Sequence, residues 1–531
     1  MGQMQYYVNL IRGGTILKRI YYLLFMILLL VGCTEEESKN QEKRSESTLN
    51  VAYLVQPPSF DPHFTNATAT RDMSRNVFET LLSFDEEYNV KPVLAESFEE
   101  NKDGTVITFH LRKGIKFHNG KEMTADDVVA SMTRWKNINT QGIAYFSGSE
   151  FRKEDDYTVT LNMDKPLTIA KYVLATPSHF AGIMPEEVIK EFAEKEVTEY
   201  IGTGPFKYNE WLQDQYIHLI KNEDYQTLSS PAGGMVGKRE PLVDHVYFYF
   251  VPDPSTRLNG IQTGEYDVAI AIPTDSISKV ENDSNLEQYM YAGGYMTIIL
   301  NKRQGLFTNE KARQAINLAV NKRDAMTAAF SNEKYFDLEH GLLAKSYSNW
   351  YNDAGKEAYD QYDPSVAKQL LKEAGYNGEP IRMLTTRDYE DQYQVAIVVQ
   401  QQLEEIGVNV DLQVYDWPTL FQLKEDDTSH DLHIMGYSPV SDPTKLYFLD
   451  SRLNTDGWTN NPKLDGLLDE LIIAKTQEEA KEIFTEIQTE SWDYMPIIKL
   501  GDFRRVALVR KDVEGFNYFE GPTVWDVSNK R

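Results

Sequence analysis

Two histidines flank an aspartate in residues 430–433, which read HDLH. Imidazole and carboxylate groups can ligate a transition metal, but only when they converge on one point. We expect this segment to be a strand, in which side chains three positions apart face opposite sides of the sheet. A metal shared by His430 and His433 is therefore not expected, and we predict no metal site.

Sequence motifs for catalysis are also missing. The chain has no zinc-protease helix, nucleophile elbow or P-loop lysine motif. Residues 202–205 (GTGP) lack the trailing glycine of a phosphate-binding loop and indicate a turn instead. The carboxylates are too numerous for a catalytic pair to stand out. We expect a protein that is not an enzyme and that needs no cofactor.

The N-terminus has the layout of a secretory signal. Basic residues precede an apolar run at residues 20–31, and Gly32 and the only cysteine, Cys33, follow it. This run is shorter than the roughly 20 residues of a membrane-spanning helix. Residues 30–33 (LVGC) resemble the lipobox of bacterial lipoproteins, in which the signal is cut before the cysteine and the thiol is diacylated. We predict a signal peptide at residues 1–32 and lipidation of Cys33.

The rest of the chain is strongly acidic, and its first residues are polar. The net charge of the whole chain is −27, which disfavours nucleic acid as a partner and favours solubility outside the membrane. Residues 34–47 (TEEESKNQEKRSES) contain no large apolar side chain. They cannot bury a core, so we predict that residues 33–47 form a lipidated, flexible tether.

The chain that follows the tether is long enough to require at least two lobes. Alternating or continuous apolar runs predict strands, and helical periodicity with capping residues predicts helices. The expected strands are residues 48–55, 106–112, 157–163, 245–251, 267–272, 381–385 and 408–414. The expected helices are residues 68–82, 124–135, 311–329, 364–374, 388–406, 463–475 and 477–492. Residues 381–414 thus form a β-α-β unit, whose crossover should be right-handed.

Several segments resemble one known family in their order along the chain. The first is residues 94–127 (LAESFEENKDGTVITFHLRKGIKFHNGKEMTADD), which is similar to the family 5 extracellular solute-binding proteins. That family includes binders of oligopeptides, dipeptides, nickel and glutathione. The resemblance recurs at residues 202–206 (GTGPF), 262–267 (QTGEYD), 312–321 (ARQAINLAVN), 362–376 (YDPSVAKQLLKEAGY) and 400–408.

The resemblance implies an α/β fold of the periplasmic-binding-protein type, cluster C, with two lobes joined by two hinge strands. We expect these strands near residues 295–301 and 494–500, where the pattern of elements changes. The implied boundaries are residues 48–79, 198–297 and 496–531 for lobe I, 80–197 for a subdomain inserted into it, and 298–495 for lobe II. A ligand would lie between lobes that close around it.

Four residues are candidates for ligand contact by position. Trp417 follows the β-α-β unit and is similar in position to a tryptophan that lines the family's pocket, although a core aromatic would also fit. Lys424 falls where an oligopeptide binder has a basic residue near the ligand, and a solvated helix face is the alternative. Tyr295 and Met296 lie at the first expected hinge strand.

The loop at residues 436–443 (GYSPVSDP) departs from the pattern of peptide binders. The resemblance matches Tyr437 to their aromatic residue and Asp442-Pro443 to their acid-proline pair. Between these, peptide binders place an aspartate that holds the α-ammonium of the ligand, and this chain has none. A buried ammonium without a carboxylate would cost several kcal/mol. Either Asp442 takes this role or the ligand is different.

These observations favour a lipid-anchored substrate-binding protein of an ABC import system, outside the cytoplasm at the cell membrane. We expect it to be a monomer that captures peptides and delivers them to a permease, whose ATPase lies inside the cell. The alternative ligand is a nickel or metallophore complex, or another non-peptide solute. A peptide hydrolase and a signalling receptor on the same fold are further alternatives that the residues leave open.

Overall fold

The computed structural model describes residues 47–531, apart from residue 168 and residues 454–456. The predicted signal peptide, the lipidation site Cys33 and nearly all of the tether lie outside the described residues. Within the described part of the chain, no helix is long and apolar enough to cross a membrane.

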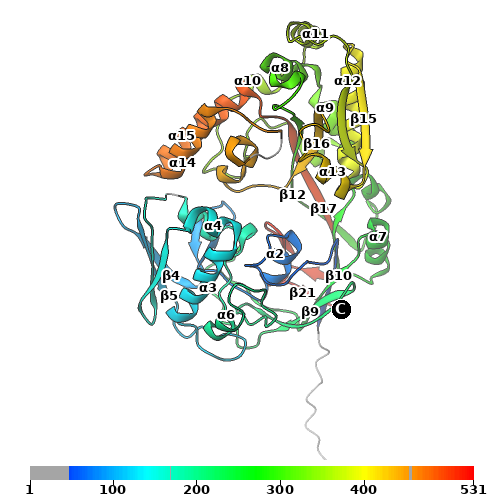
Figure 1. Cartoon of the computed structure of the whole chain (residues 1–531). Coiled ribbons are helices and arrows are strands. Elements are labelled where there is room, and N and C mark those ends of the chain that lie inside the picture. The colour runs from blue at the N-terminus through cyan, green and yellow to red at the C-terminus, as the bar shows by residue number, and fades with distance from the viewer. Residues whose placement is uncertain (1–46, 168, 454–456) are drawn as a thin grey trace, which may run out of the picture. The chain divides into compact units, whose positions relative to one another are not determined.

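One mixed sheet runs through the described chain (Figure 1). It has eleven strands, of which β13 (Phe336–Asp337) pairs with β17 alone. The other strands follow in the order β15 (Val410–Tyr415), β14 (Ile381–Thr386), β16 (Leu432–Tyr437), β12 (Leu286–Leu300), β17 (Ile497–Arg510), β11 (Val268–Ile272), β1 (Thr48–Tyr53), β10 (His245–Phe250), β9 (Tyr216–Lys221) and β8 (Phe206–Leu212).

The two longest strands of this sheet, β12 and β17, are antiparallel neighbours at its centre. Tyr291 and Val509 belong to one hydrophobic core. Ile298, Leu500 and Leu508 belong to a second core. Because the same two strands serve both cores, they join two lobes, which confirms the expected fold class. They are also longer than the hinge strands that the sequence predicts.

Helices cover the strands that belong to the second core. The β-α-β unit is confirmed, because β14 and β15 are parallel neighbours joined by α12 (Glu390–Glu405). The expected helix over residues 311–329 is wrong as a single element. It is two helices, α8 (Glu310–Ala319) and α9 (Lys322–Phe330), since Asn321 caps the second by accepting from the Asp324 amide at 3.2 Å. Three further helices are α11 (Pro364–Glu373), α14 (Pro462–Ile473) and α15 (Gln477–Tyr494).

A second, four-stranded sheet lies in residues 80–197, beside helix α3 (Ala125–Ile138) in Figure 1. Its order is β4 (Ala95–Glu100), β5 (Val106–Leu111), β7 (Thr158–Asn162) and β6 (Glu150–Asp155). Helix α3 begins as expected at Thr124, whose amide donates to Asp127 Oδ2 at 2.9 Å. The helix expected at residues 68–82 is wrong beyond Ser74, since α2 (Thr68–Ser74) ends there and β2 (Leu82–Phe84) follows.

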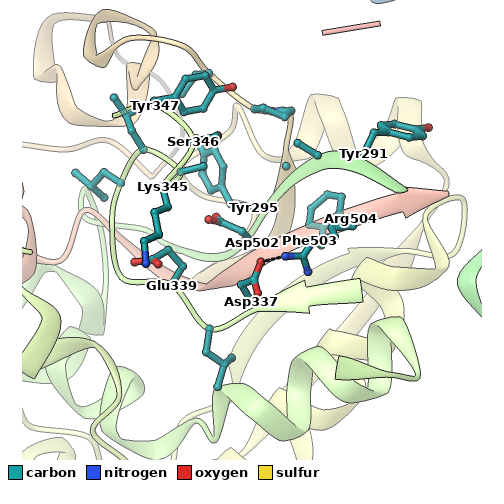
Figure 2. A pocket seen from close by; sticks show the side chains of 18 of the residues that line it. Tyr291, Tyr295, Asp337, Glu339, Lys345, Ser346, Tyr347, Asp502, Phe503 and Arg504 are labelled. Atoms are coloured by element: carbon teal, nitrogen blue, oxygen red, sulfur yellow. Dashed lines mark hydrogen bonds and ion pairs between the residues drawn. The ribbon is translucent and has the colours of Figure 1, made fainter. Parts of the chain in front are cut away.

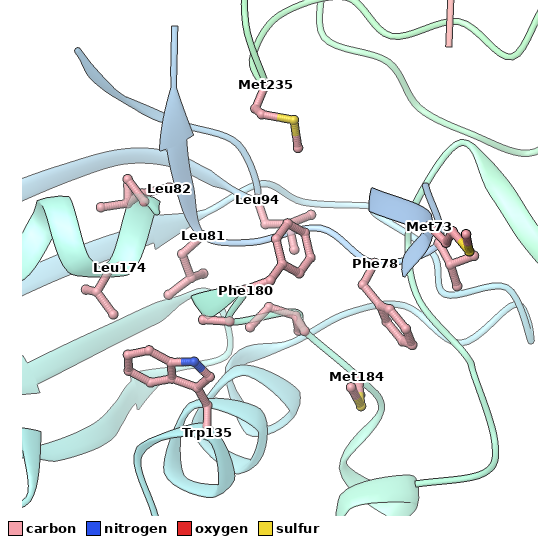
Figure 3. Close-up of a cluster of buried hydrophobic side chains, with 14 of the residues drawn as sticks. Met73, Phe78, Leu81, Leu82, Leu94, Trp135, Leu174, Phe180, Met184 and Met235 are labelled. Atoms are coloured by element: carbon pink, nitrogen blue, oxygen red, sulfur yellow. The ribbon is translucent and has the colours of Figure 1, made fainter. Parts of the chain in front are cut away.

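The hydrophobic side chains form three clusters in the described chain. The first joins residues 80–197 to the N-terminal strands, and Figure 3 shows Phe78, Trp135 and Phe180 within it. The second fills the space between the sheet and helices α8, α9 and α12. The third lies between Tyr295, Trp350 and helices α14 and α15. The boundaries of the lobes along the chain stay a prediction.

Candidate ligand-binding site

A cavity of about 600 Å³ lies beside the central strands β12 and β17 (Figure 2). Four segments of the chain line it. They are residues 290–295 of β12, residues 337–347 from the last residue of β13 onward, residues 439–440 after β16 and residues 502–504 of β17. Because β12 and β17 join the two cores, the cavity adjoins the part of the molecule where relative movement of the lobes would be centred.

Aromatic rings form much of the cavity wall, and a second ring supports each of three of them. Tyr295 stacks on Tyr437, with centroids 5.3 Å apart and ring planes 24° apart. Tyr291 stacks on Tyr518 at 3.6 Å, and Phe503 stacks on Phe330 at 5.0 Å. Rings held from behind lose little conformational entropy when they contact a ligand, and they suit apolar and π contacts.

Tyr295 and Met296 are neighbours on β12 but have different surroundings. Tyr295 pairs with Tyr437 on one side and with Asp502 on the other, and Tyr295 and Asp502 both line the cavity. Met296, the next residue, points to the opposite face and is fully buried in the second core. The structure therefore separates these two candidates, although the sequence makes them neighbours.

The cavity also has a charged side, which is formed by three carboxylates and two basic groups. Asp337 and Asp502 face each other across the β13–β17 pair, and Asp337 forms an ion pair with Arg504 (Figure 2). Asp502 Oδ1 lies 2.6 Å from Lys499 Nζ. Burial raises the pKa of Asp502 above its ordinary value, although the ion pair with Lys499 opposes this shift.

Polar neighbours stabilise the ionised form of Glu339. It accepts hydrogen bonds from Tyr351 OH at 3.0 Å and Gly341 N at 3.3 Å, and it lies 2.8 Å from His340 Nδ1. Burial acts to raise the pKa of Glu339, but these hydrogen bonds outweigh it and lower the pKa to about 2. With Lys345 and Arg504 also in the lining, the cavity can orient a ligand that has charges of both signs.

The other predicted contact residues lie outside the lining of this cavity. Trp417 begins helix α13 (Trp417–Leu423), where its amide donates to Asp388 Oδ2 at 2.7 Å and its ring packs on Tyr389 at 4.8 Å. Lys424 is buried rather than solvated, with Nζ 4.5 Å from the Phe421 ring centroid. Ligand contact by these residues stays a prediction.

Tyr437 and Asp442 occupy two different positions in the loop after β16. Tyr437 supports Tyr295 from behind and is half-buried. Asp442 is fully buried, caps a short helical turn through the Thr444 amide at 3.1 Å, and lies 3.4 Å from Lys445 Nζ. Pro439 and Val440 of the same loop line the cavity. The carboxylate of Asp442 is thus already in contact with a cation of the protein itself.

Sequence reasoning did not find the charged side of the cavity. Asp337, Glu339, Asp502 and Arg504 come from segments far apart in the chain, and no motif marks any of them. The short strand β13 brings two of these segments together by pairing with β17. One available signal was the three charged residues that interrupt the apolar strand at residues 502–505 (DFRR).

The expected geometry of His430 and His433 is wrong. Strand β16 begins at Leu432, so His430 precedes the strand and is free of its alternation. The two rings meet, with His433 Nδ1 3.2 Å from His430 Nε2. Burial lowers the pKa of His430 to about 4, and it lowers the pKa of His433 well below its ordinary value. Within the described residues, no group of three or more His, Cys, Asp or Glu side chains could hold a metal ion.

The structure thus combines a two-lobe α/β fold with a cavity beside the strands that join its lobes, an arrangement that suits capture of a solute. The family model for bacterial extracellular solute-binding proteins, family 5 Middle, matches residues 89–460. The chain therefore belongs to the bacterial extracellular solute-binding proteins of family 5.

Known relatives span nearly the whole chain. The probable peptide ABC transporter periplasmic-binding protein y4tO of Sinorhizobium fredii is 31% identical over 88% of this chain and 91% of its own length. The oligopeptide-binding protein AppA of Bacillus subtilis is 26% identical over 96% of this chain and 97% of its own length. The heme-binding protein A of Haemophilus influenzae is 28% identical over 94% of this chain and 96% of its own length. All three are named as binding proteins rather than enzymes.

Solved structures share the fold. The binding protein AgaA in complex with agropinic acid, from Agrobacterium tumefaciens R10, is 26% identical with a TM-score of 0.74, covering 91% of this chain and 99% of its own. The substrate-binding protein CtaP of Listeria monocytogenes is 22% identical with a TM-score of 0.81. The match covers 92% of this chain and 100% of the CtaP chain. At that identity, the likeness to CtaP supports the fold alone.

Proposed function

We propose that this protein captures a peptide or a similar small polar solute in the cavity beside β12 and β17, and delivers it to an ABC importer. The observation that carries the proposal is the lining itself, in which ring-supported aromatic side chains face ionised groups of both signs. Two of the relatives are named for peptides or oligopeptides, which agrees with this choice of ligand.

The cavity offers the two kinds of contact that such a ligand needs. A volume of about 600 Å³ falls within the roughly 300–1,000 Å³ of small-molecule sites. Tyr291, Tyr295 and Phe503 supply apolar area, whereas Glu339 and Arg504 supply fixed charges for the polar ends of a ligand. A micromolar dissociation constant requires about 8 kcal/mol, which a few such anchors and an enclosing wall can provide.

In this proposal the lobes close around the ligand by bending at β12. The pairing of β12 with β17 shifts register between Ala292 and Gly294 and again between Met296 and Thr297, next to the cavity. Such irregularities bend a strand locally. Residues 48–79, 198–297 and 496–531 would form lobe I, residues 80–197 its inserted subdomain, and residues 298–495 lobe II. The permease would recognise the closed shape, which the binding protein adopts when a ligand occupies the cavity.

Export and anchoring complete the proposed cycle. Residues 1–32 would direct export, and diacylated Cys33 with its acidic tether would hold a monomer near the permease while leaving it free to turn. The energy for import would come from a cytoplasmic ATPase. In this role the protein catalyses no reaction and binds no nucleic acid.

A non-peptide solute is the second candidate ligand. One observation favours it, because Asp442 already lies against Lys445 and no other carboxylate stands in the loop at residues 436–443 to hold an α-ammonium. AgaA, which is 26% identical, was solved with agropinic acid. A nickel or metallophore complex also belongs to this second candidate.

The proposal is tested by weighing the ligand that the protein retains. A soluble form beginning at residue 34 is purified without denaturation from cells grown in rich medium and examined by native mass spectrometry. We expect a ladder of adduct masses that fit peptides and disappear after unfolding and refolding. A single adduct with a non-peptide or metal-containing mass would favour the second candidate, a non-peptide solute, over peptides. Protein that carries no ligand after purification and binds none of the added solutes would contradict a binding function.

A further inference from the structure

The turn between strands β2 and β3 (Val90–Pro92) holds a tyrosine in a backbone conformation that suits glycine. Tyr88 has a φ of 60°, in the left-handed region where a Cβ crowds the backbone. Asp85 fixes the turn, because its Oδ1 accepts from the Glu87 and Asn89 amides at 3.1 and 2.8 Å. Its carbonyl oxygen also accepts from the Tyr88 amide at 3.0 Å. The turn therefore keeps a large side chain at a position where glycine would cost less free energy.

The ring of Tyr88 lies among three other aromatic rings. Its centroid is 4.2 Å from that of Tyr347, 4.9 Å from that of Phe519 and 5.7 Å from that of Phe84. Phe84 and Phe519 belong to the first hydrophobic cluster, whereas Tyr347 belongs to the third. Tyr88 thus packs against both clusters and connects them at this point.

Tyr347 is the neighbour through which this contact reaches the cavity. It lines the cavity (Figure 2) and is 2% exposed. A second bond ties the same two segments together, because Asn349 Nδ2 donates to the carbonyl oxygen of Tyr88 at 3.5 Å. Tyr88 itself lies outside the lining of the cavity. It can therefore act on a bound solute only through the residue that it holds.

We propose that Tyr88 is a positioning residue of the binding site, which holds Tyr347 in the cavity wall. This inference rests on the proposed function, because it concerns how firmly the cavity retains a solute. Tyr295, another residue of the wall, belongs to the same cluster as Tyr347. The ring of Tyr88 ties this cluster to the first one, so its loss frees the wall to move away from a bound solute.

The test measures how fast the protein releases pentapeptides of random sequence that carry a tritiated glycine. Retained solute is first removed by unfolding and refolding, and the protein is loaded with the labelled mixture. It is then diluted into an excess of unlabelled mixture and sampled by filtration. Tyr88→Gly removes the ring and suits a φ of 60°, so this variant keeps the turn.

Asp214→Gly is the matched control for the change in the backbone. Asp214 has the same φ of 60° and is exposed in the turn between β8 and β9. Its amide donates to Gln56 Oε1 at 2.6 Å, and glycine retains that bond. The control therefore eases the same backbone conformation at a site outside the lining of the cavity.

We expect Tyr88→Gly to release the peptides about tenfold faster than the wild type, the size expected for the loss of an aromatic pair. Its uptake rate should stay within about threefold of the wild type, since Tyr88 does not line the cavity and such changes act mainly on release. Asp214→Gly should take up and release the peptides as the wild type does.

A double variant separates positioning from a general loss of stability. Tyr347→Leu removes the ring that Tyr88 holds, so adding Tyr88→Gly to it should speed release by less than about threefold more. Asparagine also tolerates a positive φ, so Tyr88→Asn repeats the comparison if the glycine variant folds poorly.

Two results would overturn the inference while leaving the proposed function in place. One is a folded Tyr88→Gly variant that releases the peptides at the wild-type rate. The other is a double variant in which the separate effects of the substitutions at Tyr88 and Tyr347 on the release rate multiply. If the wild type takes up no labelled peptide, peptide capture itself is contradicted, and this inference falls with it.

Discussion

Tyr295 and Asp502 lie directly opposite each other on the central strands β12 and β17, and both line the same cavity. The apolar and the charged side of the cavity therefore meet at a single cross-strand pair. Lys499 adds to this junction, since its Nζ contacts Asp502 and lies 5.7 Å from the centroid of the Tyr295 ring. Because these strands also join the two lobes, any bending at the pair would change the shape of the cavity.

Removal of the Tyr295 ring should weaken ligand binding strongly. Tyr295→Ala takes away a wall that Tyr437 supports from behind, so we expect a loss of about tenfold to a hundredfold in affinity. Tyr295→Phe should retain most of the affinity if the ring face is the contact. Titration calorimetry with the retained ligand measures both, and Tyr362→Ala, at a tyrosine that is 48% exposed, is the control. Unchanged affinity in Tyr295→Ala would place the ligand elsewhere.

Gly294 should not tolerate a side chain. Its φ of 137° lies in a region that favours glycine, and a Cβ there would overlap the carbonyl oxygen of Tyr437. We expect Gly294→Ala to destabilise the protein by about 2–3 kcal/mol in urea denaturation. Gly378→Ala separates the two causes, because Gly378 has a φ of 96° but open space around it. It should cost about 1 kcal/mol, and equal costs for the two variants would rule out the steric overlap.

The hydrogen bonds to Glu339 should contribute stability that depends on pH. The folded-state pKa of about 2 is lower than the ordinary value of 4.5, so the contribution is complete above about pH 4.5 and is lost as the pH falls toward 2. We expect Glu339→Gln to lower the free energy of unfolding by about 1–2 kcal/mol at pH 7, after allowance for solvent screening. The difference from wild type should shrink at pH 3. The exposed Glu223→Gln is the control, and a difference that grows in acid would contradict the assignment.

Cys33 should be required for membrane attachment. Cys33→Ser removes the only thiol to which a lipid could be attached by this route. We expect the variant protein in the soluble or released fraction of cells, whereas the wild type sediments with membranes and incorporates labelled fatty acid. Ser38→Ala in the predicted tether should behave as the wild type. Labelling of the Cys33→Ser variant would show that another group anchors the protein.

Local signals predicted much of the fold because they act through neighbouring residues. The caps at Thr124 and Asp363 set the starts of α3 and α11, and Asp363 accepts from the Ser365 and Val366 amides at 3.1 and 3.0 Å. The break at Asn321 was not predicted, because its surroundings contain no glycine or proline and continue the helical period. The Asn321 side chain caps α9, and its amide donates to Gln402 Oε1 at 3.0 Å, a contact with a distant helix that the local sequence does not reveal.

The site was harder to predict than the fold. Tyr295 was predicted from the expected position of a hinge strand, and it lines the cavity. Asp502 lines the cavity because β17 pairs with β12 and β13. The contact between His430 and His433 depends on where β16 begins, which the alternation of apolar residues could not fix. The ammonium at Asp442 comes from Lys445, and lysine is a residue type that is rarely buried.

Hydrogen exchange with and without bound ligand tests most directly whether the cavity beside β12 and β17 is the binding site. Protein with its retained ligand is compared with the same protein after the ligand has been removed by unfolding and refolding. We expect ligand to slow exchange in residues 290–295, 337–347 and 502–504 together, since these segments line the cavity. Slower exchange confined to other regions would contradict the assignment, for example in residues 228–237, several of which line a separate cavity.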